Sequence, residues 1–272
     1  MQRLWQRDDH QEPSVFAPES LLREARRQRI LGDGNVPEVC LLDPDGDVVR
    51  FVQATGRGRR SVTWACYHTE LWETDVEGRT IGVIGNAVGA PFAVLVAEEV
   101  FASGGKLLVS VTSAGQLDPT LPLPCTILVH HALRGEGTSY AYLPPADSVT
   151  GDAHLLAAVS AELQQAGIAA INGSTWTTDA PFRETRSAIA SAQAVGAQAV
   201  EMEIAGLYAF AEACQKPVVC FALVTNQMAQ AGDDFEKGAD NGASHALALA
   251  AAASRAWASV APRGHHQDGG AS

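Results

Sequence analysis

Two carboxylates separated by one residue, Glu201 and Glu203, stand where the apolar period of the sequence changes. Residues 199–202 form an apolar run typical of a buried strand, and a helical period runs from Glu203 to about residue 214. Both carboxylates and the thioether of Met202 therefore fall between the carboxyl end of a strand and the start of a helix. Ligands bind at that edge of open α/β sheets, and the helix dipole favours an acidic residue in the first turn. The stretch predicts a ligand-binding site, with a solvated helix cap as the alternative.

A second pair of carboxylates, Asp45 and Asp47, flanks a glycine shortly after the apolar residues 39–42. A carboxylate within hydrogen-bond reach of a water molecule can act as a general base, and this pair is the candidate for that role. The alternative interpretation is a solvated turn, because Asp and Gly are also the residues that tight turns favour.

Four further turns with polar or glycine residues follow predicted strands. They offer hydroxyl groups, an amide, a carboxylate, an aromatic ring and backbone N–H groups, which bind anions and polar ligands. The candidates are Gly89 in turn 85–91, Ser113 and Gly115 in turn 112–116, Asp179 and Phe182 in turn 177–183, and Thr225 and Asn226 in turn 224–228. Because each turn ends a strand, we expect all four to form one rim with Glu201 and Glu203.

The elements that must position these residues alternate along the chain. Apolar runs predict strands at residues 39–42, 48–52, 62–71, 81–85, 107–111, 126–130, 169–172, 199–202 and 218–225. Helical periods predict helices at residues 21–29, 92–103, 153–165, 182–194, 203–214 and 243–258. This alternation predicts an α/β fold, a three-layer α/β/α arrangement with a mixed central sheet. We expect an N-terminal extension with a short helix at 1–37, one α/β domain at 38–260 and a flexible tail at 261–272.

The 272 residues carry a formal net charge of −12, which disfavours nucleic acid and anionic membranes as partners. No apolar run approaches the ~20 residues of a membrane span. Charged residues follow Trp5, where a signal peptide would have an apolar segment. The five cysteines are scattered without metal-binding spacing. We therefore expect free thiols in the cytoplasm, and neither a metal nor a cofactor.

The Glu-Met-Glu stretch, followed by small residues and Tyr208, resembles the ribose-binding signature of the nucleoside phosphorylase superfamily. That superfamily includes purine nucleoside and uridine phosphorylases and methylthioadenosine-type nucleosidases, and the resemblance extends over about residues 39–258. It implies the superfamily's fold and a homo-oligomer, either a dimer or a trimer of dimers. It also implies cleavage of the N-glycosidic bond of a nucleoside, with water or inorganic phosphate as co-substrate.

The resemblance further implies a role for each candidate residue: ribose binding, phosphate binding, base binding or contact with a second subunit. It places Glu203 on the ribose 2′-hydroxyl with Met202 and Glu201 beside it, Gly89 in the glycine-rich turn, Ser113 and Gly115 in the turn that binds phosphate and base, Phe182 and Asp179 at the stacking segment, Thr225 and Asn226 at the base, and His68 in a segment lent to a neighbouring subunit.

Three arginines that hold phosphate in uridine phosphorylases have no counterpart in this sequence. Their positions carry Gly46, Thr69 and Ser110, and the neighbouring Asp45 and Asp47 add negative charge. A multiply charged anion in a dry pocket requires arginine partners. We therefore expect hydrolysis, with Asp45 or Asp47 activating the water.

Three alternatives stay open. The first is phosphorolysis, with a phosphate site rebuilt from other arginines: Arg50, Arg57, Arg59, Arg60 or Arg183. The second is a protein that binds a nucleoside or another small molecule without cleaving it. Asn226 suits that alternative, because it stands where purine enzymes carry the Asp that protonates the leaving base, and an amide delivers no proton. The third is the same scaffold acting on a different kind of substrate.

Overall fold

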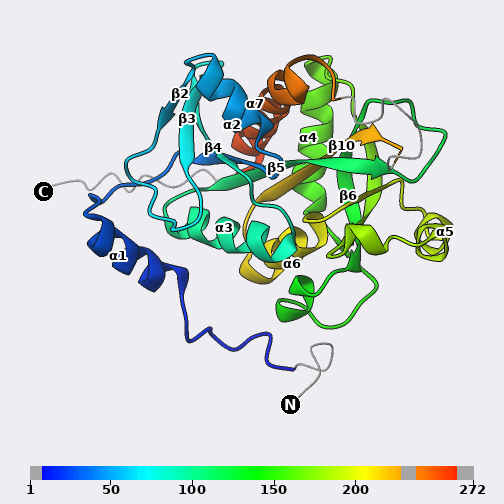
Figure 1. Cartoon of the computed structure of the whole chain (residues 1–272), viewed down its shortest axis with the longest axis horizontal. Coiled ribbons are helices and arrows are strands. Elements are labelled where there is room, and N and C mark those ends of the chain that lie inside the picture. Colours follow the sequence, from blue (N-terminus) through cyan, green and yellow to red (C-terminus); the bar gives the residue numbers. More distant parts are fainter. Residues whose placement is uncertain (1–7, 228–236, 262–272) are drawn as a thin grey trace, which may run out of the picture.

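The computed structural model describes residues 8–227 and 237–261. Within them, ten strands join in one sheet and seven α-helices surround it (Figure 1). The strands are β1 (Val39–Asp43), β2 (Gly58–Arg60), β3 (Leu71–Val76), β4 (Arg79–Gly85), β5 (Leu107–Gln116), β6 (Cys125–Gly135), β7 (Ser148–Thr150), β8 (Ile171–Thr178), β9 (Ala199–Glu201) and β10 (Val218–Asn226). The helices are α1 (Pro18–Arg29), α2 (Asp47–Ala54), α3 (Ala90–Ala102), α4 (Ala153–Gln165), α5 (Arg186–Ala194), α6 (Ile204–Cys214) and α7 (Ala243–Val260), with short 3-10 helices η2 (Thr138–Ala141), η3 (Pro181–Arg183) and η4 (Ala239–Gly242).

The central strands are buried on both faces, so alternate side chains of one strand enter different layers. In β1, Cys40 and Leu42 belong to the hydrophobic cluster under α3 and α6, whereas Val39 and Leu41 belong to the cluster under α2, α4 and α7. Figure 1 shows these two groups of helices on opposite sides of the sheet. Parallel and antiparallel strand pairs both occur. The predicted three-layer α/β/α fold with a mixed sheet is confirmed.

Strand β5 is the centre of the topology. It pairs in parallel with β1 and β10, and antiparallel with β9 at its carboxyl end. The order β10-β6-β8-β9-β5 and the additional pairing of β10 with β5 close these five strands into a ring. Gly115 of β5 lies opposite both Val200 of β9 and Asn226 of β10. Ring closure thereby brings the segments of Glu201 and Asn226 to one place.

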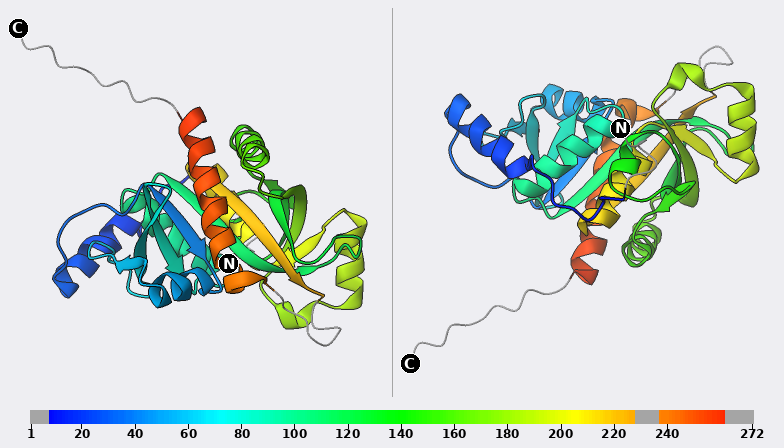
Figure 2. Two further views of the ribbon diagram at one scale, coloured as in Figure 1. Left: turned by 90° about the horizontal axis from the view of Figure 1, so that it is seen from above. Right: turned by 90° about the horizontal axis from the view of Figure 1, so that it is seen from below.

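The other half of the sheet aligns strand ends in the same way. β1 pairs in parallel with β4, with Asp43 opposite Gly85, and with β5, with Leu42 opposite Ser110. Helix α7 packs against both α2 and α4. Figure 2 shows it, in orange and red, crossing the molecule between the blue half and the green half. The turns that follow β1, β4 and β5 therefore meet at one edge of the sheet.

The prediction of a strand at residues 48–52 is wrong, because helix α2 occupies Asp47–Ala54. The side chain of Asp43 accepts hydrogen bonds from the backbone N–H groups of Val48 (2.8 Å) and Val49 (3.1 Å). These bonds satisfy two of the N–H groups that a helix start leaves unpaired. This cap outweighs the strand preference of the β-branched residues that follow it.

The strand predicted at residues 62–71 is also wrong. Residues 62–70 form a loop, and the strand β3 begins only at Leu71, the last residue of the predicted strand, and continues to Val76. β3 and β4 form a hairpin whose turn residues, Glu77 (φ 55°) and Gly78 (φ 78°), both have positive φ. That turn geometry favours a tight two-residue hairpin.

The helix predicted at residues 182–194 begins later, at Arg186, because the Thr185 hydroxyl accepts a hydrogen bond from the Ala188 N–H (3.2 Å) and caps it there. Phe182 therefore lies outside the helix. The prediction of a turn at residues 112–116 is wrong, because strand β5 continues through all of them to Gln116. The turn predicted at residues 177–183 begins later than expected, since β8 continues to Thr178. Met228 of the predicted turn 224–228 and the predicted tail from residue 262 lie outside the described residues. None of the described helices combines the length and the apolar character needed to cross a membrane.

Candidate active site

Glu201 is the last residue of β9 and only 3% exposed, and both of its carboxylate oxygens accept hydrogen bonds from the protein. One oxygen accepts from the hydroxyl groups of Thr175 (3.0 Å) and Thr177 (2.5 Å) in β8. The other accepts from the backbone N–H groups of Glu203 (2.7 Å) and Ile204 (2.8 Å). Glu201 thus fastens the start of α6 to the sheet, and its oxygens are taken by four protein donors.

Glu203 precedes the first residue of α6 and is 1% exposed. One carboxylate oxygen accepts from the backbone N–H of Gly89 (2.7 Å), and the other from the hydroxyl of Thr112 (2.7 Å). Gly89, whose φ is 88°, immediately precedes helix α3. The carboxylate therefore lies at the positive end of the α3 dipole, and each of its oxygens keeps capacity for a further donor.

No cation is paired with Glu201 or Glu203 among the residues that the structure describes. Burial and the neighbouring charge of Glu203 raise the pKa of Glu201 to about 7. Burial, assisted by the charge of Asp45, also raises the pKa of Glu203. Neutral N–H and O–H donors hold this pair in a dry environment, in which electrostatic interactions are strong.

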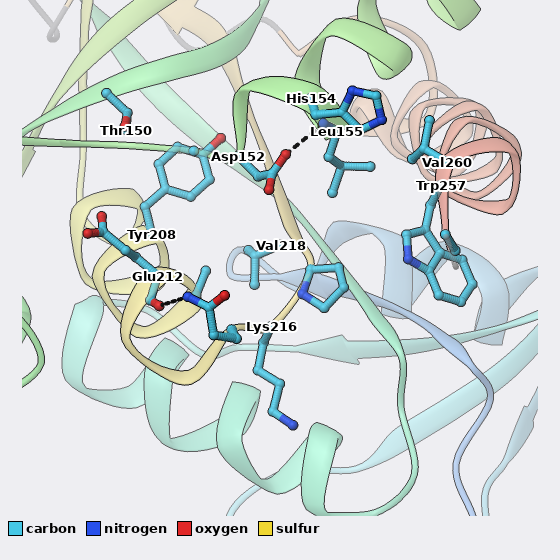
Figure 3. Close-up of a pocket in the computed structure, with 15 residues that line it drawn as sticks. Thr150, Asp152, His154, Leu155, Tyr208, Glu212, Lys216, Val218, Trp257 and Val260 are labelled. Carbon is cyan, nitrogen blue, oxygen red and sulfur yellow. Dashed lines mark hydrogen bonds between the residues drawn. The ribbon is translucent and has the colours of Figure 1, made fainter. Parts of the chain in front are cut away.

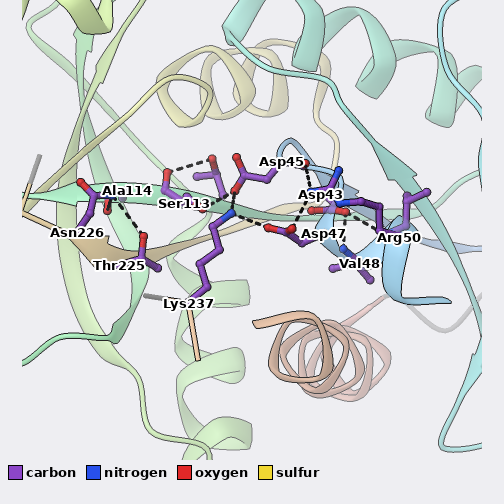
Figure 4. Close-up of polar contacts among 12 residues, drawn as sticks. Asp43, Asp45, Asp47, Val48, Arg50, Ser113, Ala114, Thr225, Asn226 and Lys237 are labelled. Carbon is purple, nitrogen blue, oxygen red and sulfur yellow. Dashed lines mark hydrogen bonds and ion pairs between the residues drawn. The ribbon is translucent and has the colours of Figure 1, made fainter. Parts of the chain in front are cut away.

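Asp45 lies in the turn between β1 and α2, Asp47 is the first residue of α2, and both bind one lysine (Figure 4). The Nζ atom of Lys237 donates to Asp45 Oδ2 (3.0 Å) and to Asp47 Oδ2 (2.5 Å), while Arg50 donates to the other oxygen of Asp47 (2.6 Å). Partial burial pushes the pKa of Asp47 upward, but the hydrogen bonds from Lys237 and Arg50 outweigh it and leave that pKa below its ordinary value. Lys237 therefore contacts both aspartates, and the ion pairs with Lys237 and Arg50 favour the ionised form of Asp47.

Two consecutive residues of β5 connect the acidic pairs. The Thr112 hydroxyl donates to Glu203, and the Ser113 hydroxyl donates to Asp45, on the same oxygen that Lys237 binds. Asp45 and Glu203 are thus separated only by the polar end of β5. Strands β1 and β5 and helix α6 together build one acidic site.

On the other side of Gly115, the buried residues Thr225 and Asn226 end strand β10. The amide of Asn226 donates to the Ala114 carbonyl (3.4 Å) and to the Thr225 hydroxyl (3.3 Å). Met202, between the two glutamates, is partly exposed and offers an apolar surface beside them. The structure therefore gathers most of the predicted rim: Glu201, Met202, Glu203, Gly89, Asp45, Asp47, Ser113, Gly115, Thr225 and Asn226.

Three predicted residues have other surroundings. Phe182 is 98% exposed, so its ring stacks on nothing within the chain. Asp179 accepts a hydrogen bond from the Gly137 N–H (2.9 Å), which fastens the loop before η2. His68 is exposed in the loop before β3, where its ring meets the ring of Phe92 edge-on, with centroids 6.2 Å apart.

Sequence reasoning missed Lys237, although it is one of only three lysines in the chain. It lies 190 residues beyond Asp47, and no local pattern connects the two. The supporting hydroxyl groups of Thr112, Thr175 and Thr177 were also missed as site residues. Their signal is present in the sequence, as hydroxyl residues near the carboxyl ends of predicted strands.

The three positions at which uridine phosphorylases carry phosphate-binding arginines have different surroundings in this structure. Gly46 has a φ of 76°, and a Cβ atom there would lie 2.5 Å from Asn86 Oδ1 and 2.9 Å from an Arg50 nitrogen. Such distances exclude any larger side chain unless the neighbours move. Ser110 is fully buried, and the Thr69 hydroxyl accepts a hydrogen bond from the Trp64 indole (3.0 Å).

A separate cavity of about 510 Å³ lies at the opposite end of β10, between the carboxyl ends of α6 and α7 (Figure 3). Its lining includes Asp152, His154, Lys216, Val218 and Trp257, and none of the predicted site residues. In the described ranges, no cluster of His, Cys, Asp and Glu side chains has the arrangement that holds a metal ion.

The fold is the one found in nucleoside phosphorylases and nucleosidases. The structure is similar to that of purine nucleoside phosphorylase from Toxoplasma gondii in complex with immucillin-H, with a TM-score of 0.68 and 18% identity over 82% of this chain and 92% of that chain. It is also similar to that of AMP nucleosidase from Bacteroides thetaiotaomicron VPI-5482, with a TM-score of 0.66 and 23% identity over 88% of this chain and 96% of that chain.

The family model of the phosphorylase superfamily matches residues 41–261, and the chain belongs to that superfamily. The resemblance stated from the sequence is therefore confirmed. Membership supports an activity of nucleoside phosphorylase or nucleosidase type, without choosing between the two. Direct comparison with curated proteins finds no match.

Proposed function

We propose that the protein hydrolyses the N-glycosidic bond of a ribonucleoside or a close analogue. One observation carries the choice of water over phosphate. Ser113, which the superfamily resemblance assigns to phosphate binding, donates its hydroxyl to the carboxylate of Asp45, and Lys237 binds the same oxygen. A phosphate dianion in that place would meet a carboxylate, and like charges repel most strongly where water is scarce.

The same arrangement supplies a base. Asp45 accepts the proton of a water molecule while the water oxygen attacks C1′ of the sugar, which has oxocarbenium-like character in such reactions. The C1′–N bond breaks, and its electron pair leaves with the base. Asn226 can bind the departing base by hydrogen bonds but gives it no proton, so the proton that the base takes up comes from solvent. Lys237 and Ser113 are positioning residues for Asp45.

Glu203 is the residue proposed to bind the sugar. Its two oxygens are fixed by Gly89 and Thr112, and each retains a lone pair for a ribose hydroxyl. A buried carboxylate that accepts a hydrogen bond from the 2′-hydroxyl also stabilises positive charge developing at the neighbouring C1′. Glu201 is assigned to positioning instead of substrate contact, because its oxygens are already occupied by four donors.

The proposal includes a homo-oligomer in the cytoplasm. The exposed positions of His68 and of Phe182, whose ring is 98% exposed, leave both free to meet a second subunit or a bound base. The free state of all five cysteines suits a reducing compartment. Size-exclusion chromatography with light scattering tests the assembly, and a monomer at micromolar concentration would overturn that part.

The test of the reaction is a panel of purine and pyrimidine nucleosides, incubated with the purified protein with and without inorganic phosphate. Chromatography measures the free base and identifies the sugar product. Equal turnover in both conditions with free ribose as the product supports hydrolysis. Turnover that requires phosphate and yields ribose 1-phosphate overturns it. Nucleoside binding without turnover at any pH between 5 and 9 overturns it in favour of a binding protein.

A further inference from the structure

On the outer side of the Asp45 turn lies a second cleft, of about 450 Å³, whose charge is opposite to that of the chain as a whole. Three arginines line it from three different elements: Arg29 at the end of α1, Arg50 in α2 and Arg60 in β2. Glu70 is the one acidic side chain in the lining. A concave, cationic surface attracts a small anion. Because the protein as a whole carries a net charge of −12, a larger anionic partner would be repelled by the surrounding surface.

Two of the three arginines of this cleft are only partly committed to protein partners, whereas Arg50 pairs with Asp47 (2.6 Å) and donates to the Asp45 carbonyl (2.9 Å). Arg29 donates to the backbone carbonyls of Ala65 (3.3 Å) and Cys66 (2.7 Å), and has no carboxylate partner in the described part of the chain. Arg60 pairs with Glu70 at 2.9 Å, and both side chains are about half exposed. An exposed pair of that kind contributes little and exchanges readily. Guanidinium groups therefore remain available for a bidentate anion.

The cleft also offers a phenol hydroxyl and an imidazole, and the Tyr67 hydroxyl donates to Gln28 (2.9 Å). Tyr67 and His68 line it, and His68 meets Phe92, the third residue of α3. Phosphate monoesters bind such combinations of guanidinium, hydroxyl and imidazole groups through several hydrogen bonds at once.

The cleft shares a wall with the acidic site. Gly46, which lies between Asp45 and Asp47, lines it, and so does Asn86. Three residues after Asn86, the N–H of Gly89 binds Glu203. Three residues span at most about 11 Å. The distance between a ligand held by Glu203 and the cleft is therefore no more than about the length of one nucleotide.

We propose that this cleft binds a phosphate monoester, and that the source of the phosphate is the 5′-phosphate of the substrate. The substrate is then a nucleoside 5′-monophosphate, with its ribose on Glu203 and its phosphate among Arg29, Arg50 and Arg60. This proposal rests on the proposed function for the ribose position. The cleft itself is argued from its own residues.

The experiment combines binding and turnover in the wild-type protein and three variants. Calorimetric titration with ribose 5-phosphate, ribose and inorganic phosphate reports the cleft without any reaction. The ratio of kcat/KM for a nucleoside 5′-monophosphate to kcat/KM for the same nucleoside reports its use in catalysis. The test variants are Arg60→Gln and Arg60→Lys. The matched control is Arg59→Gln. Arg59 is the neighbouring residue of β2 and is itself exposed, pairs with the largely buried Glu73 on the strand's other face and does not line the cleft.

We expect ribose 5-phosphate to bind at least about 10-fold more tightly than ribose. This is the difference in affinity that one charge-assisted hydrogen bond contributes. Arg60→Gln lowers both this preference and the kcat/KM ratio by about 10-fold, Arg60→Lys lowers them partly, and Arg59→Gln preserves both. Thermal unfolding of the two glutamine variants serves as the check on folding.

Three results separate the possible failures. If ribose 5-phosphate binds no better than ribose while nucleosides are hydrolysed, the cleft proposal is overturned and the hydrolase stands. If no substrate is turned over but Arg60→Gln abolishes tight binding of ribose 5-phosphate, the phosphate site stands and the proposed function fails. If turnover requires inorganic phosphate and Arg60→Gln raises the concentration required, the cleft holds the co-substrate, and the 5′-phosphate assignment is overturned.

Discussion

The two acidic pairs of this protein have the same spacing and opposite electrostatics. Glu201 and Glu203 are buried and held by neutral N–H and O–H donors, and their pKa values are raised. Asp45 and Asp47 are half-buried and held by Lys237 and Arg50, and the pKa of Asp47 is lowered. The first arrangement suits the recognition of neutral hydroxyl groups, and the second places a lysine against the carboxylate that we propose as the base. The comparison indicates that the donors around a carboxylate, more than its residue type, determine whether it binds substrate or takes part in the reaction.

The largest effect should come from removing the proposed base. Asp45→Asn removes the acceptor for the water proton and lowers kcat by about 10²- to 10⁴-fold, the usual contribution of a general base. The matched variant Asp47→Asn should lower kcat less than about 10-fold, because Asp47 contributes a partly exposed ion pair. Steady-state kinetics with the best nucleoside of the panel measures both. Equal loss in the two variants would remove the distinction between the aspartates.

A smaller effect should follow from Glu203→Gln. The variant loses the charge that the ribose hydroxyl contacts, and kcat/KM should fall about 10- to 100-fold, the weight of a hydrogen bond to a charged group. The informative readout is the ratio of kcat/KM for the ribonucleoside to that for its 2′-deoxy analogue. That ratio should be high in the wild type and close to one in the variant. Equal kcat/KM values of the wild-type protein for the ribonucleoside and its 2′-deoxy analogue would contradict the assignment.

Glu201→Gln should act on stability before activity. Glutamine retains one acceptor oxygen and presents an amide NH₂ to two of the four donors, and each buried donor left unpaired costs about 1–3 kcal/mol. Chemical denaturation measures the change in the free energy of unfolding. Arg59→Gln, an exposed change, is the control. An unchanged free energy of unfolding would mean that the start of α6 does not depend on this cap.

The pH dependence of stability provides a second readout of the same residue. The pKa of Glu201 is raised from 4.5 to about 7, so the folded state binds this proton more tightly than the unfolded state. Its contribution to stability is fully present below about pH 4.5 and is lost as pH rises through 7. Between pH 5 and 7 the free energy of unfolding should fall by up to ~1.4 kcal/mol per pH unit for this one proton. Glu201→Gln should flatten that slope.

The smallest effect should come from Lys237→Gln. The cation lowers the pKa of Asp47, so its contribution to stability is present at neutral pH and is lost as pH falls through the folded pKa, below the ordinary value of 3.8. Partly exposed ion pairs contribute about 1 kcal/mol or less. The difference in unfolding free energy between wild type and variant should shrink in 1 M salt. A difference that persists unchanged at high salt and at pH 3 would contradict the ionic account.

The sequence predicted the fold class and the place of the Glu201 and Glu203 pair, because both depend on local patterns. A period change from strand to helix marks the junction at Glu203, and alternating apolar segments predict the layers. The start of α2 escaped prediction, since its cap is the side chain of Asp43, a residue of the preceding strand. The β-branched residues Val48, Val49 and Val52 favour a strand, and the capping contact overrides that preference.

The contacts that give the site its character are not local. Lys237 meets Asp45 and Asp47 across about two-thirds of the chain, and Ser113 meets Asp45 only because β5 pairs beside β1. No periodicity encodes such contacts. Phe182 is a different case: an aromatic residue in a matching segment suggested stacking on a base, and because its ring is exposed within this chain, that stacking stays a prediction.

Gly46 has a consequence for how this lineage can change. An arginine at that position is a single substitution, but its Cβ would collide with Asn86 and Arg50, and its backbone would keep a left-handed conformation that costs about 1–2 kcal/mol for residues other than glycine. The intermediate with only that substitution would be less stable than either endpoint. An arginine there therefore requires the side chains of Asn86 and Arg50 to move or to be substituted, and it keeps the left-handed backbone that the turn imposes.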